Sequence, residues 1–143
     1  MTQRAAWWAI ATTLSVAICP ACFSDPSEGV LGPGTVQPTL SSIQEHVFTT
    51  TCALSGCHAP PAPQLDLDLS SGQAHAHLVG TASAEQPARN RVTPGDPTDS
   101  YLYMKITGDA RIAGDPMPLG GAPLPADEVQ AIRAWIEAGA ADD

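Results

Sequence analysis

The spacing of apolar residues predicts four short helices separated by long irregular segments. Within each predicted helix, apolar positions recur three or four residues apart, which places their side chains on one helix face. The clearest stripes are Ile43, Val47 and Phe48, then Leu102 and Ile106, then Val129, Ile132 and Ile136. Trp135 lies at the edge of the last stripe and is expected to fill the core. This pattern favours an all-α fold.

Capping residues and helix breakers set the expected helix ends. Ser41 or Ser42 can cap the first helix, and Glu45 would complete a capping box with Ser42 before the helix delivers the chain to Cys52. The other helices are expected over residues 71–79, from Asp99 or Ser100 to Ile106, and from Pro125 to Gly139. Glycines after the second and fourth helices supply their C-terminal stops.

The segments between the helices are rich in proline and glycine. Three prolines keep residues 59–63 extended, so this segment either presents a backbone carbonyl to the ring of His58 or forms a stiff surface loop. Apolar and acidic residues alternate over residues 65–69, which predicts a short extended segment that buries its leucines. Residues 81–90 are polar and are expected to form a surface loop. Four prolines and four glycines predict another loop over residues 108–125.

The first 40 residues are expected to lie outside the folded domain. Residues 1–21 are typical of an export signal, with Arg4 before an apolar run, although such a run can also stay as a membrane anchor. Ala21-Cys22 resembles the end of a lipoprotein signal, so lipidation of Cys22 is weighed against plain cleavage. Residues 22–40 lack periodicity and are expected to form a flexible linker, which leaves 41–143 as the domain.

Composition and charge narrow the classes of partner and of fold. The chain has 143 residues, a formal net charge of −9 and only six Lys and Arg, so it cannot neutralise a nucleic-acid backbone. An acidic surface favours a redox or other partner with a basic docking surface. Aromatic residues make up only 5% of the chain, and its 14 prolines and 12 glycines imply much irregular structure. A large flat cofactor at the centre of the fold would compensate for both.

The segment Cys52-Ala53-Leu54-Ser55-Gly56-Cys57-His58 carries the most distinctive chemistry. Two cysteines with a histidine directly after the second suit covalent haem, because both sulfurs can bond the porphyrin vinyl groups while the imidazole binds iron. The common spacing is C-x-x-C-H, whereas four residues separate the cysteines here. The same residues leave two alternatives open: a Cys52–Cys57 disulfide in an oxidising compartment, and zinc bound with a remote histidine.

Met117 is the strongest candidate for a second iron ligand. It stands between Pro116 and Pro118 in a loop of small residues, and Pro118 favours an extended conformation for Met117. A methionine displayed in this way is a poor core residue, and its uncharged thioether can bind iron in both oxidation states. Met104 is its rival, but it lies in a predicted helix where filling a core gap is the more natural role.

Four motifs occur in an order that resembles the class I c-type cytochromes with a C-x4-C-H haem-binding segment. They are C-x4-C-H, R-V-x-P-G-D-P-x-x-S-Y-L at residues 91–102, Met117-Pro118, and L-P-A-D-E-V-Q-A-I-R-A-W-I-E-A-G-A at residues 124–140. The resemblance covers about residues 42–140. It implies a small all-α cytochrome fold in which the N- and C-terminal helices pack around one haem.

The resemblance also implies the roles of the site residues. Cys52 and Cys57 would anchor haem c covalently, His58 would be the proximal iron ligand and Met117 the distal one. With both axial positions filled, the protein would carry single electrons between redox partners in the periplasm and would not be an enzyme. Arg91, Tyr101 and Arg111 are candidates to bind the haem propionates, and each is equally suited to an ordinary surface position.

Two other classes of function stay open at the level of the sequence. One is a haem-free exported lipoprotein domain that is stabilised by a Cys52–Cys57 disulfide and acts as a binding or structural module. The other is a peroxidase-like haem enzyme in which Met117 does not bind iron. The haem-free lipoprotein domain does not explain why His58 directly follows Cys57, nor why a methionine stands between two prolines.

Overall fold

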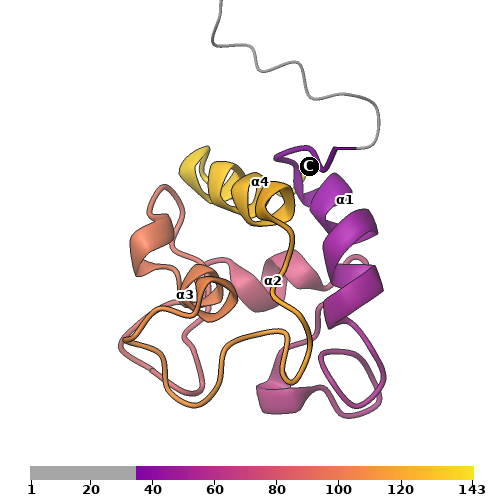
Figure 1. Cartoon of the computed structure of the whole chain (residues 1–143), viewed down its shortest axis with the longest axis vertical. Coiled ribbons are helices and arrows are strands. Elements are labelled where there is room, and N and C mark those ends of the chain that lie inside the picture. The colour runs from indigo at the N-terminus through magenta and orange to yellow at the C-terminus, as the bar shows by residue number, and fades with distance from the viewer. Residues whose placement is uncertain (1–34) are drawn as a thin grey trace, which may run out of the picture. The chain divides into compact units, whose positions relative to one another are not determined.

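The computed structural model describes residues 35–143, which form a helical domain without strands (Figure 1). Its elements are α1 (Leu40–Ile43), the π-helix η1 (Gln44–Cys52), the 3-10 turn η2 (Gln64–Asp66), α2 (Ala74–Leu78), the 3-10 turn η3 (Pro97–Asp99), α3 (Tyr101–Thr107) and α4 (Ala126–Glu137). Long loops join these helices, in agreement with the expected all-α class. No helix in residues 35–143 is long and apolar enough to cross a membrane.

The first helix begins earlier than its capping residues predicted. Thr39 is the N-cap of α1, and its hydroxyl accepts a hydrogen bond from the Ser42 amide at 3.3 Å. The predicted capping box of Ser42 and Glu45 is therefore wrong, because Ser42 lies inside the helix and its hydroxyl accepts from the Gln37 amide at 2.9 Å instead. α1 continues directly into η1, which ends at Cys52 as expected (Figure 1).

The hydrophobic core extends to residues that the sequence assigned to the linker. Val36 and Leu40 are buried and belong to the same core cluster as the apolar residues of α1, η1 and α4. The packed domain therefore starts before residue 41. The expected export signal, Cys22 and the linker up to residue 34 lie outside the described residues.

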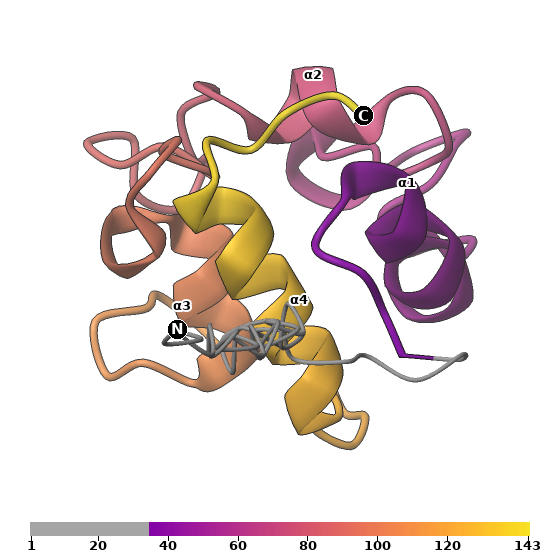
Figure 2. The same cartoon turned by 90° about the horizontal axis from the view of Figure 1, so that it is seen from above.

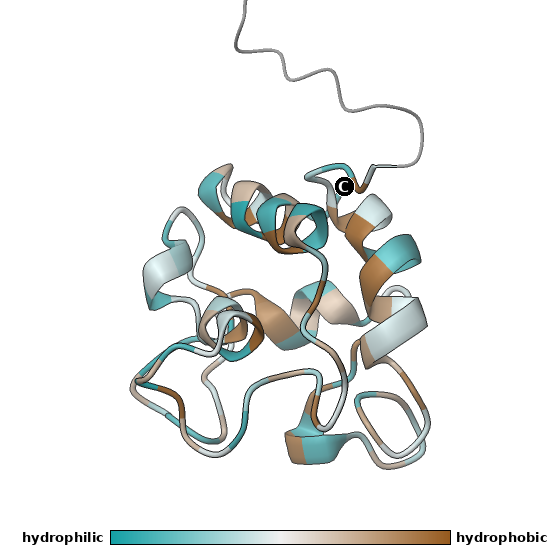
Figure 3. Ribbon diagram, viewed as in Figure 1, coloured by the Kyte–Doolittle hydropathy of each residue, from teal (hydrophilic) through white to brown (hydrophobic). Residues whose placement is uncertain are grey.

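α4 contacts both the first and the third helix, and it carries the predicted apolar stripe. Ile132, Trp135 and Ile136 are fully buried, and the Trp135 indole N–H donates to the Ala141 carbonyl at 2.9 Å. Viewed from above, α4 lies between α1 and α3 (Figure 2). Its outer side is hydrophilic and its apolar residues turn toward the core (Figure 3). The predicted packing role of Trp135 is confirmed.

The third helix begins at the predicted residue but without the predicted cap. Ser100 occupies the N-cap position of α3, yet its side chain makes no capping hydrogen bond. Its hydroxyl instead accepts from the Thr93 amide at 2.9 Å and donates to the Asp96 carbonyl at 2.7 Å. The buried Ser100 hydroxyl thus ties the turn before α3 together.

The sequence predicted an extended segment over residues 65–69, but the structure is extended over only part of it. Leu65 lies in η2 with a left-handed φ of 53°, and its side chain is 52% exposed. Leu67 is half-buried, and of the three leucines only Leu69 enters the core. The alternation fails because η2 turns the chain at Leu65 and Asp66, whose carbonyls are bound by Arg91 from a distant segment.

Candidate functional site

The Cys52–His58 segment forms a closed turn at the end of η1. The His58 amide donates to the Cys52 carbonyl at 3.2 Å, and the Cys57 amide donates to the Leu54 carbonyl at 2.9 Å. Gly56 sits between them with a left-handed φ of 83°, which glycine adopts without a steric cost. Both thiols are free, Cys52 half-buried and Cys57 exposed. The turn therefore keeps the wider-spaced cysteines and the histidine in one structural unit.

Cys52 is a neutral thiol whose ionisation is opposed by burial and by nearby charges. Burial raises the pKa of Cys52 to about 12, and the nearby charges of Glu128 and Cys57 raise it as well. Glu128 lies in the first turn of α4, and one of its carboxylate oxygens is buried without a hydrogen-bond partner among the described residues. Burial also raises the pKa of Glu128. Glu128, in the first turn of the final helix, thus acts electrostatically on Cys52.

His58 is held as a neutral imidazole, the form that binds a metal. Burial is the largest cause that lowers its pKa, and the charges of Arg91 and Lys105 also lower it, while the carbonyls of Leu67 and Gln64 act in the opposite direction. Its Nδ1 is buried without a hydrogen-bond partner in the described part of the chain. The Gln64 and Leu67 carbonyls come after the proline-rich segment. Of the two roles considered for residues 59–63, the carbonyl contact with His58 is therefore not the one observed.

Arg91 holds the turn that faces His58. Its guanidinium donates to the carbonyls of Leu65 at 2.7 Å, Asp66 at 3.3 Å and His77 at 2.9 Å, and the residue is only 9% exposed. Its donors are therefore used by backbone carbonyls of η2 and α2. In this arrangement Arg91 acts on the chain around His58, which differs from the propionate contact considered above.

Met117 lies half-buried in the loop between α3 and α4. Its amide donates to the Lys105 carbonyl in α3 at 2.9 Å, and its peptide bond to Pro118 is cis. No hydrogen bond joins Met117 to the Cys52–His58 turn within residues 35–143. The rival Met104 is 1% exposed in α3, which is the core position expected for it.

Lys105 links the two predicted axial ligands. Its charge lowers the pKa of His58, and its backbone carbonyl holds the amide of Met117. Half-buried Cys52 and half-buried Leu124, near the end of the Met117 loop, both pack against the hydrophobic core.

Exposed leucines stand near the predicted site residues in the sequence. Leu54 is 45% exposed between the two cysteines, Leu65 is 52% exposed in η2, and Leu119 is 67% exposed two residues after Met117. Exposed apolar residues beside polar functional groups are typical of a surface that a ligand or partner covers. Free thiols, a neutral imidazole with an unpartnered nitrogen, a thioether and these leucines together fit haem c.

The remaining propionate candidates are already engaged within the protein. The Tyr101 hydroxyl is buried and accepts from the Ala113 amide at 2.9 Å. Arg111 is exposed and pairs with Asp109 at 2.7 Å. The sequence did not single out Lys105 or Glu128. One feature of the sequence could have indicated that Lys105 is buried. It stands four residues after Tyr101 and next to Met104, and all three are buried in α3.

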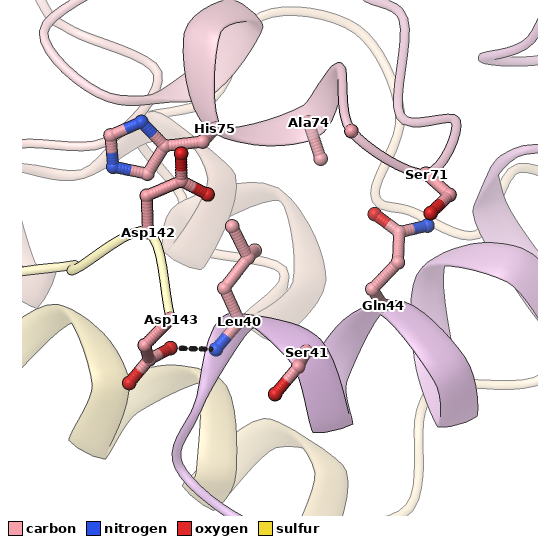
Figure 4. A pocket seen from close by; sticks show the side chains of 9 residues that line it. Leu40, Ser41, Gln44, Ser71, Ala74, His75, Asp142 and Asp143 are labelled. Carbon is pink, nitrogen blue, oxygen red and sulfur yellow. Dashed lines mark hydrogen bonds between the residues drawn. The ribbon is translucent and has the colours of Figure 1, made fainter.

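Two cavities in residues 35–143 are lined by residues other than those of the predicted site. One of about 140 Å³ lies between α1, α2 and the C-terminal residues, where His75, Gln44 and Asp143 contribute to its lining (Figure 4). Another, of about 190 Å³, is apolar and lies between Val36 and α4. Within residues 35–143 no group of three or more His, Cys, Asp or Glu side chains is placed to hold a metal ion, which the zinc alternative would require.

Comparison with known protein families, with curated proteins and with solved structures finds no match for this chain.

Proposed function

We propose that this protein is a mono-haem c-type cytochrome that carries single electrons between redox partners. The observation that carries the proposal is the closed turn in which two free thiols and a neutral imidazole form one unit at the end of η1. The disulfide-stabilised module gives no reason for His58 to follow Cys57 directly. Haem c, when bound, supplies reversible one-electron transfer at its iron.

Each site residue has a specific role in this proposal. Cys52 and Cys57 would hold the macrocycle by thioethers, each sulfur adding to one vinyl carbon and the thiol hydrogen to the other. His58 would be the proximal ligand, since its imidazole is already unprotonated at neutral pH. Met117 would be the distal ligand, and this pair of ligands raises the potential relative to other haem ligations. With both axial positions filled, no substrate reaches the iron.

The arrangement of the helices supports a class I cytochrome c fold. α1 with η1 forms the N-terminal helix that leads to Cys52, and α4 packs against it as the C-terminal helix. The exposed leucines beside the cysteines and Met117 would be covered by the ring. The loops that carry Met117 and His58 would then enclose it from both faces.

The proposed location is the periplasm, after export directed by residues 1–21. Lipidation of Cys22 would tether the protein to the membrane, with the linker separating the haem domain from it. The net charge of −9 suits a redox partner with a basic docking surface and excludes a nucleic-acid partner.

Covalent haem is tested by expressing the full chain with the haem c maturation machinery and staining a denaturing gel for haem. A stained band is expected for the parent protein and none for the double variant Cys52→Ala/Cys57→Ala. Cys22→Ala is the matched control, because it removes a cysteine outside the turn and should leave the stain unchanged. A folded, exported but colourless parent protein would contradict the proposal and favour the disulfide-stabilised module.

The distal ligand is tested on the purified ferric protein by its weak red absorbance band, which a methionine–iron bond produces. Met117→Leu is expected to abolish the band, whereas Met104→Leu, a change in the neighbouring core, should retain it. Absence of the band in the parent protein, together with peroxide turnover, would indicate a peroxidase-like open site instead.

A further inference from the structure

Lys105 is a buried cation on the helix that precedes the Met117 loop. The residue is 6% exposed, and its ammonium lies 3.0 Å from a carboxylate oxygen of Glu85 and 3.0 Å from the Ala113 carbonyl. The same ammonium lies 5.8 Å from the ring centroid of Tyr101. Its charge is thus stabilised by an anion, a carbonyl and an aromatic face.

Both backbone polar groups of Ala113 are held by this cluster. The Tyr101 hydroxyl accepts from the Ala113 amide at 2.9 Å, while the Lys105 ammonium binds the Ala113 carbonyl. Four residues later, the Met117 amide donates to the Lys105 carbonyl at 2.9 Å. The stretch from Ala113 to Met117 is therefore fixed to α3 at both of its ends.

Gly114 suits the backbone conformation of this stretch, because residues with side chains rarely adopt a positive φ. It has a left-handed φ of 65°, and a Cβ atom there would lie 3.4 Å from Glu85 Oε1. Beyond Met117 the loop is held less tightly, since Leu119 is 67% exposed. The fixed part of the loop is thus the part that ends at the candidate ligand.

An ion pair that buries a lysine is a costly way to stabilise a helix position. Removing two charges from water offsets most of their attraction, and a well-packed apolar residue often serves stability as well or better. Buried ionic groups can instead determine which of several conformations a segment adopts. Here the segment so determined is the loop that presents Met117.

We propose that Lys105, Glu85 and Tyr101 form a clamp that positions Met117 as the distal iron ligand. These are positioning residues, because they act through the backbone of residues 113–117. The role at iron rests on the proposed function, whereas the fixing of the loop does not. Loosening the clamp should let an added ligand displace Met117 more easily.

The test uses the haem-loaded protein and titrates the ferric form with imidazole, which competes with Met117 for iron. Lys105→Met and Tyr101→Phe are expected to bind imidazole about tenfold more tightly than the parent protein. Lys105→Arg keeps the charge and should restore most of the parent affinity. Arg133→Gln removes the exposed Arg133–Glu137 pair and should change the affinity by less than about twofold.

Stability is measured in parallel by thermal unfolding, because a purely structural role would lower the unfolding temperature without tightening imidazole binding. That outcome would overturn the clamp. Should Lys105→Met not fold, Glu85→Gln provides the same comparison, since it removes the anion from a partly exposed position. Unchanged imidazole affinity in Glu85→Gln and Tyr101→Phe would also overturn it.

Amide hydrogen exchange separates failure of the clamp from failure of the proposed function. If the purified protein holds no haem, the cytochrome proposal fails, but exchange at Ala113 and Met117 still reports on the loop. These two amides are expected to exchange about tenfold faster in Glu85→Gln, while amides in α4 stay unchanged. Equal rates in parent and variant would refute the clamp in either state of the protein.

Discussion

Replacing Arg91 should destabilise the domain because this residue compensates for an unfavourable turn. Leu65 and Asp66 both adopt a left-handed conformation, with φ of 53° and 54°. Such a conformation costs a non-glycine residue about 1 kcal/mol or more. Arg91 offsets that cost by donating to the carbonyls of both residues and to that of His77.

The size of the effect follows from these contacts. Arg91→Met keeps most of the aliphatic stem but removes three charge-assisted hydrogen bonds, each contributing about 1.5 kcal/mol or more. Part of that loss is recovered because a charge is no longer buried. We therefore expect a net loss of about 3 kcal/mol in the free energy of unfolding, which is a large fraction of the stability of a small domain.

Urea unfolding followed by far-ultraviolet circular dichroism measures this loss. Arg91→Lys should lose about half as much, since one ammonium reaches fewer of the three carbonyls. Leu65→Gly should stabilise the domain by about 1 kcal/mol, because glycine adopts the left-handed conformation without strain. The exposed Arg133→Met is the control and should cost less than about 1 kcal/mol. A loss in Arg91→Met no larger than in this control would refute the reasoning.

The two cysteines and the Asp109–Arg111 ion pair give further predictions. On haem-free protein at about pH 8, an alkylating reagent should modify exposed Cys57 well before Cys52, because a pKa of about 12 leaves about one Cys52 thiol in ten thousand ionised. Peptide mass spectrometry distinguishes the two, and equal rates would contradict the burial of Cys52. Arg111 lowers the pKa of Asp109 to about 2, so Asp109 contributes stability that is present above about pH 4 and lost as the pH falls to about 2. Asp109→Asn should therefore lose less stability over that range, as urea midpoints at several pH values would show; parallel losses would argue against the pairing.

The sequence predicts the elements best where burial alone decides them. The stripe of Ile132 and Ile136 identifies the side of α4 that enters the core, and Trp135 fills it as expected. Met104 likewise takes the core position that its helical context predicts. In these cases the three- to four-residue spacing of apolar residues along one helix determines which side chains are buried. No contact with a distant residue is needed for that prediction.

Distant contacts explain where the predictions fail. Leu65 is exposed because Arg91, 26 residues later, binds its carbonyl and stabilises a left-handed turn that alternation cannot reveal. α1 begins at Leu40 because that side chain finds a core built mostly from later residues. The local pattern around Ser42 was a sound cap signal, but tertiary packing determined the start of the helix.

The same limit applies to the candidate site. The proposed roles of Cys52, Cys57, His58 and Met117 come from motifs that lie within a few residues of each of them. Lys105 and Glu85 belong to no motif, since an ion pair between a loop and a helix 20 positions apart has no periodicity. Supporting residues of this kind become visible only when the folded chain brings them together.

The start of α1 depends on a residue that lies 103 positions later in the chain. The Leu40 amide donates to the Asp143 carboxylate at 2.7 Å across 103 positions (Figure 4). The Ser41 amide also donates to the Asp143 carbonyl, at 3.0 Å. Contacts this far apart in the chain form late in folding. A chain that emerges N-terminus first therefore exposes Cys52 and Cys57 before Asp143 is available to bind the start of α1. Enzymes that modify cysteines would meet an accessible, unfinished segment, and closure of the domain would follow that modification.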